Sequence, residues 1–156
     1  MTFTYESTTD EVLEGIDLSG RRIVITGAAS GLGEESTRAL AAHGASVLML
    51  ARDPAKNDEA AARVRDAVPD AELSLDTVDL ADIASIRSFA ARYVDAGEPI
   101  DVLMNNAGVM ACPFGHTADG FEMQFGTNHL GHFELTRQLT PAGLAGNAGI
   151  GHVRYP

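Results

Sequence analysis

Residues 22–33 read RIVITGAASGLG, and this stretch predicts a strand, a glycine-rich turn and the start of a helix, in that order. Apolar residues then recur at helical spacing from about Leu32 to His43, where Gly44 supplies a stop signal. Glycines let a backbone approach an anion closely, and free N–H groups at a helix N-terminus supply donors. The spacing G-x-x-x-G-x-G in this position predicts a nucleotide-binding turn, with an ordinary tight turn as the alternative.

Predicted strands and helices continue to alternate along the chain. Three further apolar runs predict strands, at 46–51, 73–78 and 100–104. Between them, Asp53 and Pro54 open one predicted helix, and apolar residues at helical spacing predict another over 83–94. Continuous apolar strands separated by amphipathic helices are typical of a parallel sheet that is covered on both faces. The expected fold is a three-layer, doubly wound α/β sheet.

The composition of the chain excludes several classes of function. The chain has 156 residues, the usual size of one domain, and 11 Lys and Arg against 22 Asp and Glu give a net charge of -11. Nucleic-acid-binding proteins normally carry clustered basic residues, so no nucleic-acid partner is expected. The single Cys112 excludes an intramolecular disulfide, and no apolar run is long enough to span a membrane. Because the first residues lack the features of a secretory signal, the expected location is cytoplasmic, with no membrane partner.

The end of the second predicted strand indicates which dinucleotide is preferred. A dinucleotide site reads the adenosine ribose there, with an acid for the 2'-hydroxyl of NAD or an arginine for the 2'-phosphate of NADP. Ala51 stands where the acid is expected, and Arg52 follows it. This favours NADP, with NAD as the second candidate. The competing interpretation is that Arg52 is a solvated strand-end residue and Asp53 only a helix cap.

Four motifs resemble those of the short-chain dehydrogenase/reductase family. They are Thr26–Gly33, Asp79-Leu80, Asn105–Gly108 and Asn128. Residues 119–133 further resemble the retinol-dehydrogenase-like and protochlorophyllide-reductase-like branch, and the resemblance covers about residues 18–140. It implies a Rossmann-type fold that is incomplete at its C-terminal side, and a nicotinamide cofactor.

The resemblance also implies roles for individual residues. The cofactor phosphates would contact the backbone of Gly27, Ser30, Gly31 and Leu32, while Gly33 would permit close packing of helix and strand. Asp79 would bind the adenine beside the Leu80 main chain, and Arg52 would select the 2'-phosphate. The ribose next to nicotinamide would be lined by Asn106, Ala107 and Gly108. Asn128 would kink its helix and hold a water in the proton relay, as the one catalytic residue retained.

The sequence departs from the family at its acid-base pair, which is a tyrosine followed four residues later by a lysine. The tyrosines are Tyr5, Tyr93 and Tyr155, and the sole lysine is Lys56. No tyrosine therefore has the required partner. A tyrosine near its ordinary pKa of about 10 is a poor acid-base catalyst at neutral pH.

The end of the chain reads PAGLAGNAGIGH over 141–152. This composition suits neither a helix nor a strand, and it does not resemble the family's fifth strand. We expect an acidic leader over 1–20, a cofactor-binding domain over 21–140 and a divergent glycine-rich tail over 141–156. Truncation or a shifted reading frame near Thr140 would explain the tail, with a natural flexible tail as the alternative. An uncovered sheet edge would then favour self-association.

Two other sequence patterns, a pair of histidines and the single cysteine, give little evidence of a function. His129 and His132 stand at a metal-ligand spacing without a third ligand, so no metal is expected. Cys112 has no cationic neighbour in the sequence and is expected to be a plain thiol.

The resemblance implies an NADP(H)-dependent oxidoreductase that interconverts a hydroxyl and a carbonyl of a small substrate. The alternative, favoured by the missing acid-base pair, is a non-catalytic NADP-binding module or an inactive fragment.

Overall fold

The structure is a computed structural model that describes residues 3–145 and 149–152. Its centre is a parallel sheet of five strands in the order β3-β2-β1-β4-β5. The strands are β1 (Arg22–Thr26), β2 (Ser46–Ala51), β3 (Leu73–Thr77), β4 (Val102–Asn105) and β5 (Gly149–His152). In the register, Val24 of β1 lies between Leu48 of β2 and Leu103 of β4. The predicted strands over 46–51 and 73–78 are therefore present, and the predicted strand over 100–104 begins two residues later.

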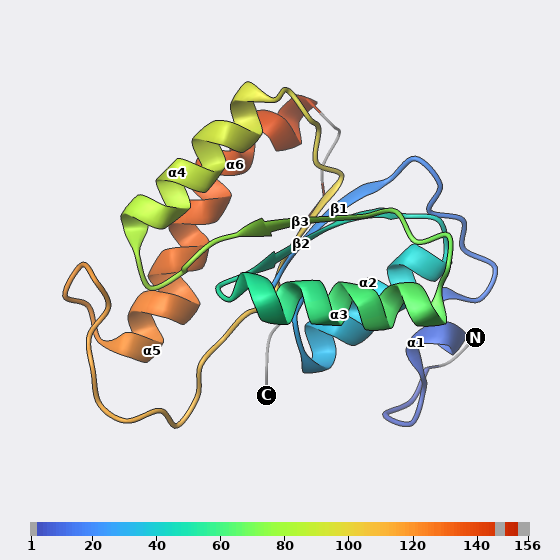
Figure 1. The fold of residues 1–156 in the computed structure, drawn as a ribbon, viewed down its shortest axis with the longest axis horizontal. Helices are drawn as coiled ribbons and strands as arrows, with labels where there is room; N and C mark the ends of the chain where they lie inside the picture. The colour runs from blue at the N-terminus through green and yellow to red at the C-terminus, as the bar shows by residue number, and fades with distance from the viewer. Residues whose placement is uncertain (1–2, 146–148, 153–156) are drawn as a thin grey trace.

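Helices cover both faces of the sheet, with α2 and α3 on one face and α4 and α6 on the other (Figure 1). The helices are α1 (Thr9–Leu13), α2 (Gly31–Ala42), α3 (Pro54–Ala67), α4 (Ile83–Asp95), α5 (Met123–Phe125), the π-helical turn η1 (Gly126–Gly131) and α6 (His132–Ala145). Asp53 caps α3 and Asp82 caps α4, each by accepting backbone N–H bonds in the first turn. The predicted three-layer, doubly wound fold is confirmed.

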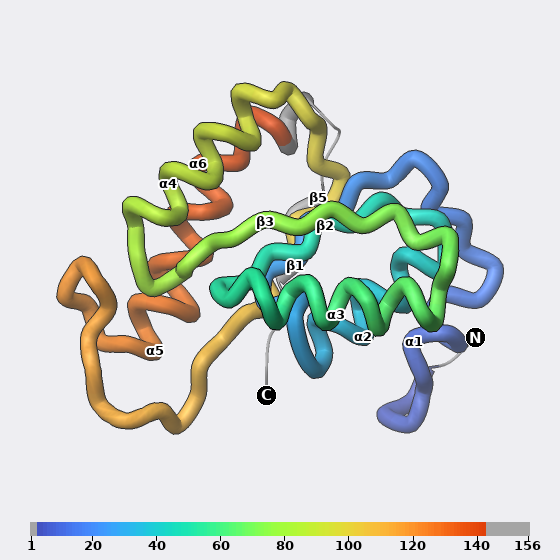
Figure 2. The backbone as a smooth tube through the Cα atoms, in the orientation of Figure 1, coloured from blue at the N-terminus to red at the C-terminus, as the bar shows by residue number. Residues whose placement is uncertain are grey.

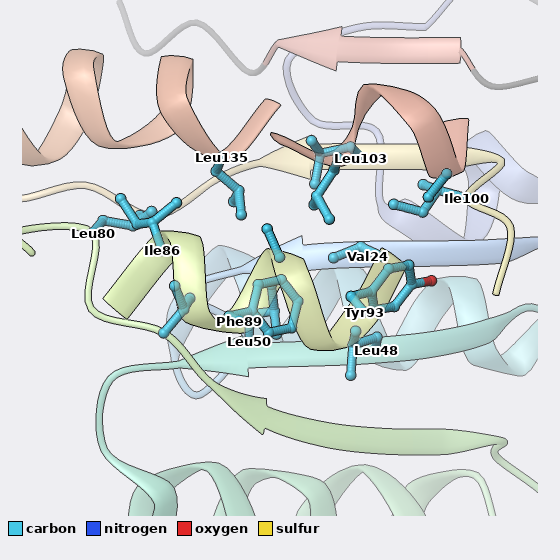
Figure 3. Packing of buried hydrophobic residues seen from close by; sticks show 14 residues of the cluster. Val24, Leu48, Leu50, Leu80, Ile86, Phe89, Tyr93, Ile100, Leu103 and Leu135 are labelled. Atoms are coloured by element: carbon cyan, nitrogen blue, oxygen red, sulfur yellow. The ribbon is translucent and has the colours of Figure 1, made fainter. Parts of the chain in front are cut away.

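Two apolar clusters hold the layers together, because successive strand residues point to opposite faces. Ile23 and Ile25 of β1 pack with the small residues of α2 and α3. Val24 packs on the other face with α4 and α6, where Phe89 and Leu135 are fully buried (Figure 3). Small residues let α2 and α3 approach the sheet closely, while larger side chains fill the thicker layer beneath α4 and α6.

The structure corrects the prediction for residues 141–152, which was that they form neither a helix nor a strand. Helix α6 continues through Pro141 to Ala145, and β5 pairs in parallel with β4 from Val102↔Gly149 to Asn105↔His152. Tertiary packing overrides the low helix propensity, because Leu139 and Ala142 are buried in the cluster beneath α4. Glycines still supply the backbone groups of a ladder, so β4 is paired on this side and β5 is the edge strand.

The acidic residues 1–20 were expected to be an exposed leader with at most a short turn. They contain α1, which is closed by a reciprocal capping box between Thr8 and Glu11. None of its residues is buried, but Asp10 pairs with Arg38 of α2 at 2.9 Å. Further along the segment, Leu18 packs against the apolar cluster around Ile23 and Ile25, so polar and apolar contacts both attach residues 1–20 to the body of the protein.

Candidate functional site

A cleft of about 750 Å³ lies at the carboxyl ends of the strands. The chain leaves β1 for β2 and β3 on one side and returns to β4 on the other, and ligands of open α/β sheets bind at such a switch point. All of the predicted cofactor-binding residues line this cleft: Gly27, Ser30, Gly31, Leu32, Gly33, Arg52, Asp79, Leu80, Asn106, Ala107 and Gly108. The fold thus brings together residues that are far apart in the sequence.

The glycine turn after β1 leaves no room for side chains at two positions. Gly27 has φ of 66°, and a Cβ there would lie 2.9 Å from the Ala107 Cα. A Cβ on Gly33 would overlap the Gly27 carbonyl and lie 2.6 Å from the Asn106 Nδ2. Gly31 also has a positive φ, of 54°, although nothing lies near it. The first two glycines allow close packing, and the third allows the backbone conformation.

The N-terminus of α2 opens onto the cleft without a side-chain cap. Its N-cap residue Ser30 makes no capping hydrogen bond, whereas the N-termini of α1, α3, α4 and α5 are each capped by a side chain. Backbone N–H groups at such an end, together with the helix dipole, form a site for an anion. This uncapped end fits a pyrophosphate, which would supply the missing acceptors.

The turn after β4 is fixed to the end of β1 by hydrogen bonds. The backbone N–H groups of Asn106 and Ala107 both donate to the Thr26 Oγ1, each at 3.0 Å. The Asn106 Nδ2 also donates to the Thr26 carbonyl at 2.9 Å. Thr26 and Asn106 are buried, so these bonds are shielded from water. Sequence reasoning placed Thr26 in a motif without a role, although a threonine that ends a buried strand is a signal for such a bond.

Two cations stand at the end of the cleft that lies beside β2 and α3. Arg52 directly follows β2, and Lys56 lies in the first turn of α3. In the described part of the chain neither has an acidic partner. Acidic partners are instead held by Arg21, Arg22, Arg38, Arg63, Arg87, Arg92 and Arg137. Sequence reasoning missed Lys56, whose place four residues after Arg52 in the first turn of a helix was the available signal.

Asp79 and Leu80 form the wall of the cleft beyond β3. The Asp79 carboxylate accepts the Ala81 N–H at 2.9 Å, and the Asp79 N–H donates to the Ser85 Oγ at 3.0 Å. Leu80 is buried. The contacts hold the Asp79 side chain in one orientation at the rim of the cleft.

Asn128 lies outside this cleft, in the π-helical turn η1. Its side chain forms two hydrogen bonds of 2.8 Å with the backbone of Val109, one to the N–H and one to the carbonyl. Figure 2 shows the segment between β4 and α5, in orange, that Asn128 holds in this way. A second hollow of about 480 Å³ adjoins Asn128, with Asn105, His129, His132 and Phe133 among its lining. The Asn128 amide therefore acts on protein backbone, and its implied role in holding water stays a prediction.

No described tyrosine lies at the cleft. Tyr93 is buried, accepts from the Arg22 Nε at 3.2 Å and donates to the Pro99 carbonyl at 3.3 Å. Arg22 opens β1, so Tyr93 lies at the opposite end of the sheet, where burial raises the pKa of its phenol. Tyr5 is 97% exposed near the N-terminus, and Tyr155 lies outside the described residues.

The described residues contain neither a cluster of metal ligands nor a helix that could span a membrane. No group of three or more His, Cys, Asp and Glu side chains is placed to hold a metal ion there. Within residues 3–145 and 149–152, every helix is too short or too polar to cross a membrane.

The chain matches known proteins along most of its length. The family model for short chain dehydrogenases matches residues 21–151. Retinol dehydrogenase 12 of Mus musculus is 40% identical over 145 residues, which cover 88% of this chain and 46% of the relative. A crystal structure of a Mycobacterium paratuberculosis protein has a TM-score of 0.71 and 46% identity, over 81% of this chain and 44% of its own. The Pseudomonas aeruginosa RhlG/NADP active-site complex has a TM-score of 0.67 and 27% identity, and the match covers 81% of this chain and 47% of the RhlG chain.

A parallel sheet with a glycine-lined cleft at its switch point defines the Rossmann class of α/β proteins. Within this class, the chain belongs to the short-chain dehydrogenase family, as the resemblance predicted. Proteins of this family are oxidoreductases that use nicotinamide cofactors. The chain spans less than half the length of the curated relatives it matches, with 46% of the mouse protein covered.

Proposed function

We propose that this chain binds NADPH in the cleft between β1, β2 and β4 and forms the cofactor half of an oxidoreductase that interconverts a hydroxyl and a carbonyl. The observation that carries the proposal is that one cleft combines an uncapped helix N-terminus with two cations that have no acidic partner among the described residues. The first fits a pyrophosphate, and the second fits an additional phosphate on the adenosine ribose.

The charges of the residues that line the cleft favour NADPH over NADH. The chain has a net charge of -11, so an anionic ligand is repelled unless cations line its site. Arg52 and Lys56 supply those cations, and Ala51 leaves the ribose without the carboxylate that would favour a free 2'-hydroxyl. The RhlG complex with NADP, a fold relative at 27% identity, supports this assignment.

In the proposed reaction, the bound nicotinamide supplies hydride transfer to or from a substrate carbon. The residues of this chain would bind the cofactor and orient its nicotinamide. The first turn of α2 would hold the phosphates, and Asn106 to Gly108 would line the ribose beside the nicotinamide. The described residues that line the cleft include no tyrosine, so the tyrosine that the family uses as its proton donor is not among them.

The missing acid-base pair supports a second candidate, a module that binds the cofactor without turnover. The substrate is proposed only as a small alcohol or carbonyl compound. The name of the mouse relative indicates retinol for that protein, and an apolar alcohol is therefore a reasonable first substrate to test.

Titration calorimetry with NADPH and NADH tests the proposal. We expect selective NADPH binding, and Arg52→Ala should weaken it about tenfold or more, because a charge-assisted hydrogen bond contributes roughly 1.5–3 kcal/mol. Arg65→Ala is the matched control, since Arg65 lies on the neighbouring helix α3, outside the cleft, and bonds to the Leu73 carbonyl. Equal affinity for the two cofactors would contradict the NADPH preference, and binding of neither would contradict the function.

Turnover separates the two candidates. Hydride transfer by the chain, measured as NADPH consumption with an aldehyde and compared with cofactor in buffer, would support the oxidoreductase. Selective binding without transfer would support the module.

A further inference from the structure

His132 is a buried polar residue with no role in the function proposed above. It opens α6 immediately after η1 and is 6% exposed. Its backbone N–H donates to the His129 carbonyl, while its imidazole Nδ1 lies 2.9 Å from the Asn128 carbonyl. On the other side of the ring, the Nε2 lies 2.9 Å from the Thr26 Oγ1. The imidazole thus spans the distance between η1 and the end of β1.

The partners of the ring assign its protonation. The Asn128 carbonyl can only accept, so the Nδ1 must carry a proton. The Thr26 Oγ1 already accepts the N–H groups of Asn106 and Ala107, which occupy both of its lone pairs. Its own proton must therefore be donated, and the Nε2 at 2.9 Å is a closer acceptor than the Met104 carbonyl at 3.4 Å. For these contacts of the ring, the neutral form with a proton on Nδ1 satisfies both partners.

These bonds complete a closed circuit. Thr26 holds Ala107, the chain runs on to Val109, and Val109 pairs with the Asn128 side chain. The Asn128 carbonyl accepts from His132, which returns the circuit to Thr26. Without the imidazole, the hydrogen bonds of this circuit would tie η1 to the turn after β4 but not to β1.

We propose that His132 is a positioning residue which, as the neutral Nδ1-protonated ring, fixes η1 and Asn128 against the turn that follows β1. The proposal rests on the proposed function in one respect, because Thr127 of η1 and Val109, next to which the circuit runs, line the cleft assigned to NADPH. It acts through Thr26 and Asn128, and it is not expected to touch the cofactor.

Nitrogen-15 NMR of the imidazole in the full chain tests the protonation without any cofactor. We expect a protonated Nδ1 and an unprotonated, hydrogen-bonded Nε2 at neutral pH. Thr26→Val should shift the Nε2 resonance toward that of a free nitrogen, whereas Thr26→Ser should retain the bonded value. A proton on Nε2, on either the neutral ring or the imidazolium, would overturn the proposal.

Substitution tests the positioning. In His132→Leu and His132→Gln, amide hydrogen exchange at Val109 should be about tenfold faster, the change that corresponds to one lost hydrogen bond in the circuit. His129→Gln is the matched control, because His129 lies on the same helical segment but is exposed and stacks on Phe125. Faster exchange in the control to the same extent, or no change in His132→Gln and His132→Leu, would overturn the proposal.

NADPH affinity distinguishes this proposal from the proposed function. If the unmodified chain binds NADPH, His132→Gln should weaken binding about tenfold while His129→Gln leaves it unchanged. If the unmodified chain binds no NADPH, the proposed function fails, but the protonation and exchange measurements still decide the role of His132.

Discussion

At Gly33, helix α2 and the turns after β1 and β4 come so close that a side chain has no room. A Cβ would overlap the Gly27 carbonyl and lie 2.6 Å from the Asn106 Nδ2. We expect Gly33→Ala to lower the free energy of unfolding by about 1–3 kcal/mol, because the turns must move apart. Urea denaturation checks this, with Gly115→Ala as control, whose nearest atom would be 3.9 Å away. Equal unfolding midpoints for the two variants would contradict the packing argument.

Residues of this kind are accessible to sequence reasoning when a local constraint fixes the residue type. Gly27 and Gly33 were predicted because only glycine fits a turn that packs so closely. His132 and Lys56 were not, because their partners are set by tertiary structure. His132 meets Thr26 across 106 positions of sequence, and nothing near His132 in the chain indicates that contact.

Between elements, the ion cluster at Glu134 joins α4 to α6. Glu134 is buried and accepts from Arg87 of α4 at 2.8 Å and from Arg137 and Gln138 of its own helix. These hydrogen bonds lower the pKa of the carboxyl well below its usual value of 4.5. Because the arginines are more than half exposed, we expect Glu134→Gln to cost only about 1 kcal/mol of unfolding free energy at pH 7.

The sign of the pH dependence follows from the lowered pKa. Above about pH 5 the carboxyl is ionised in both the folded and unfolded states, so the stabilisation is fully present. Below the usual value of 4.5 the unfolded chain takes up the proton first, and the stabilisation is lost as pH falls toward the folded pKa. Urea denaturation between pH 7 and pH 3 should show the gap between wild type and Glu134→Gln narrowing with acid. Glu72→Gln, at an exposed position, is the control, and a gap that widens would refute the argument.

Elements were predicted well where pattern and packing agree, and poorly where they conflict. The strand over 46–51 and the helix opened by Asp53 and Pro54 follow from apolar runs and capping residues. The π-helical form of η1 was not predicted beyond a kink, because an i to i+5 turn has no simple periodic signal. The strand β5 was missed because its residues pair by backbone while their composition argues against a strand.

Across the whole molecule, the two ends of the sheet have different tasks. The amino ends of the strands hold structural ion pairs and bonds, with Arg21 on Asp101 and Arg22 on Tyr93. The carboxyl ends hold the cleft, the uncapped N-terminus of α2 and the cations Arg52 and Lys56. Polar groups are thus satisfied within the protein at one end, and at the other they are available to a ligand. This division favours the cleft over any other described surface as the functional site.

We expect the protein to self-associate through the edge strand β5 and the exposed aromatic rings of α5, η1 and α6. In the described sheet β5 is the edge strand, and Phe125 and Phe133 are 54% and 62% exposed. Phe125 stacks on His129, and His129 and Phe133 line the same hollow. We call the exposed rings of Phe125, His129 and Phe133 the strip. An edge strand and exposed aromatic rings each favour contact with a second copy.

We therefore expect the molar mass measured by light scattering to rise with protein concentration. Phe133→Glu should shift the equilibrium toward monomer, because it places a charge in the strip. Tyr5→Glu adds the same charge at a 97% exposed position near the N-terminus and should leave the association unchanged. A monomer that keeps its mass over the whole concentration range would show that the edge and the strip do not associate. Equal effects of the two variants would assign any association to net charge, which is already -11, rather than to this surface.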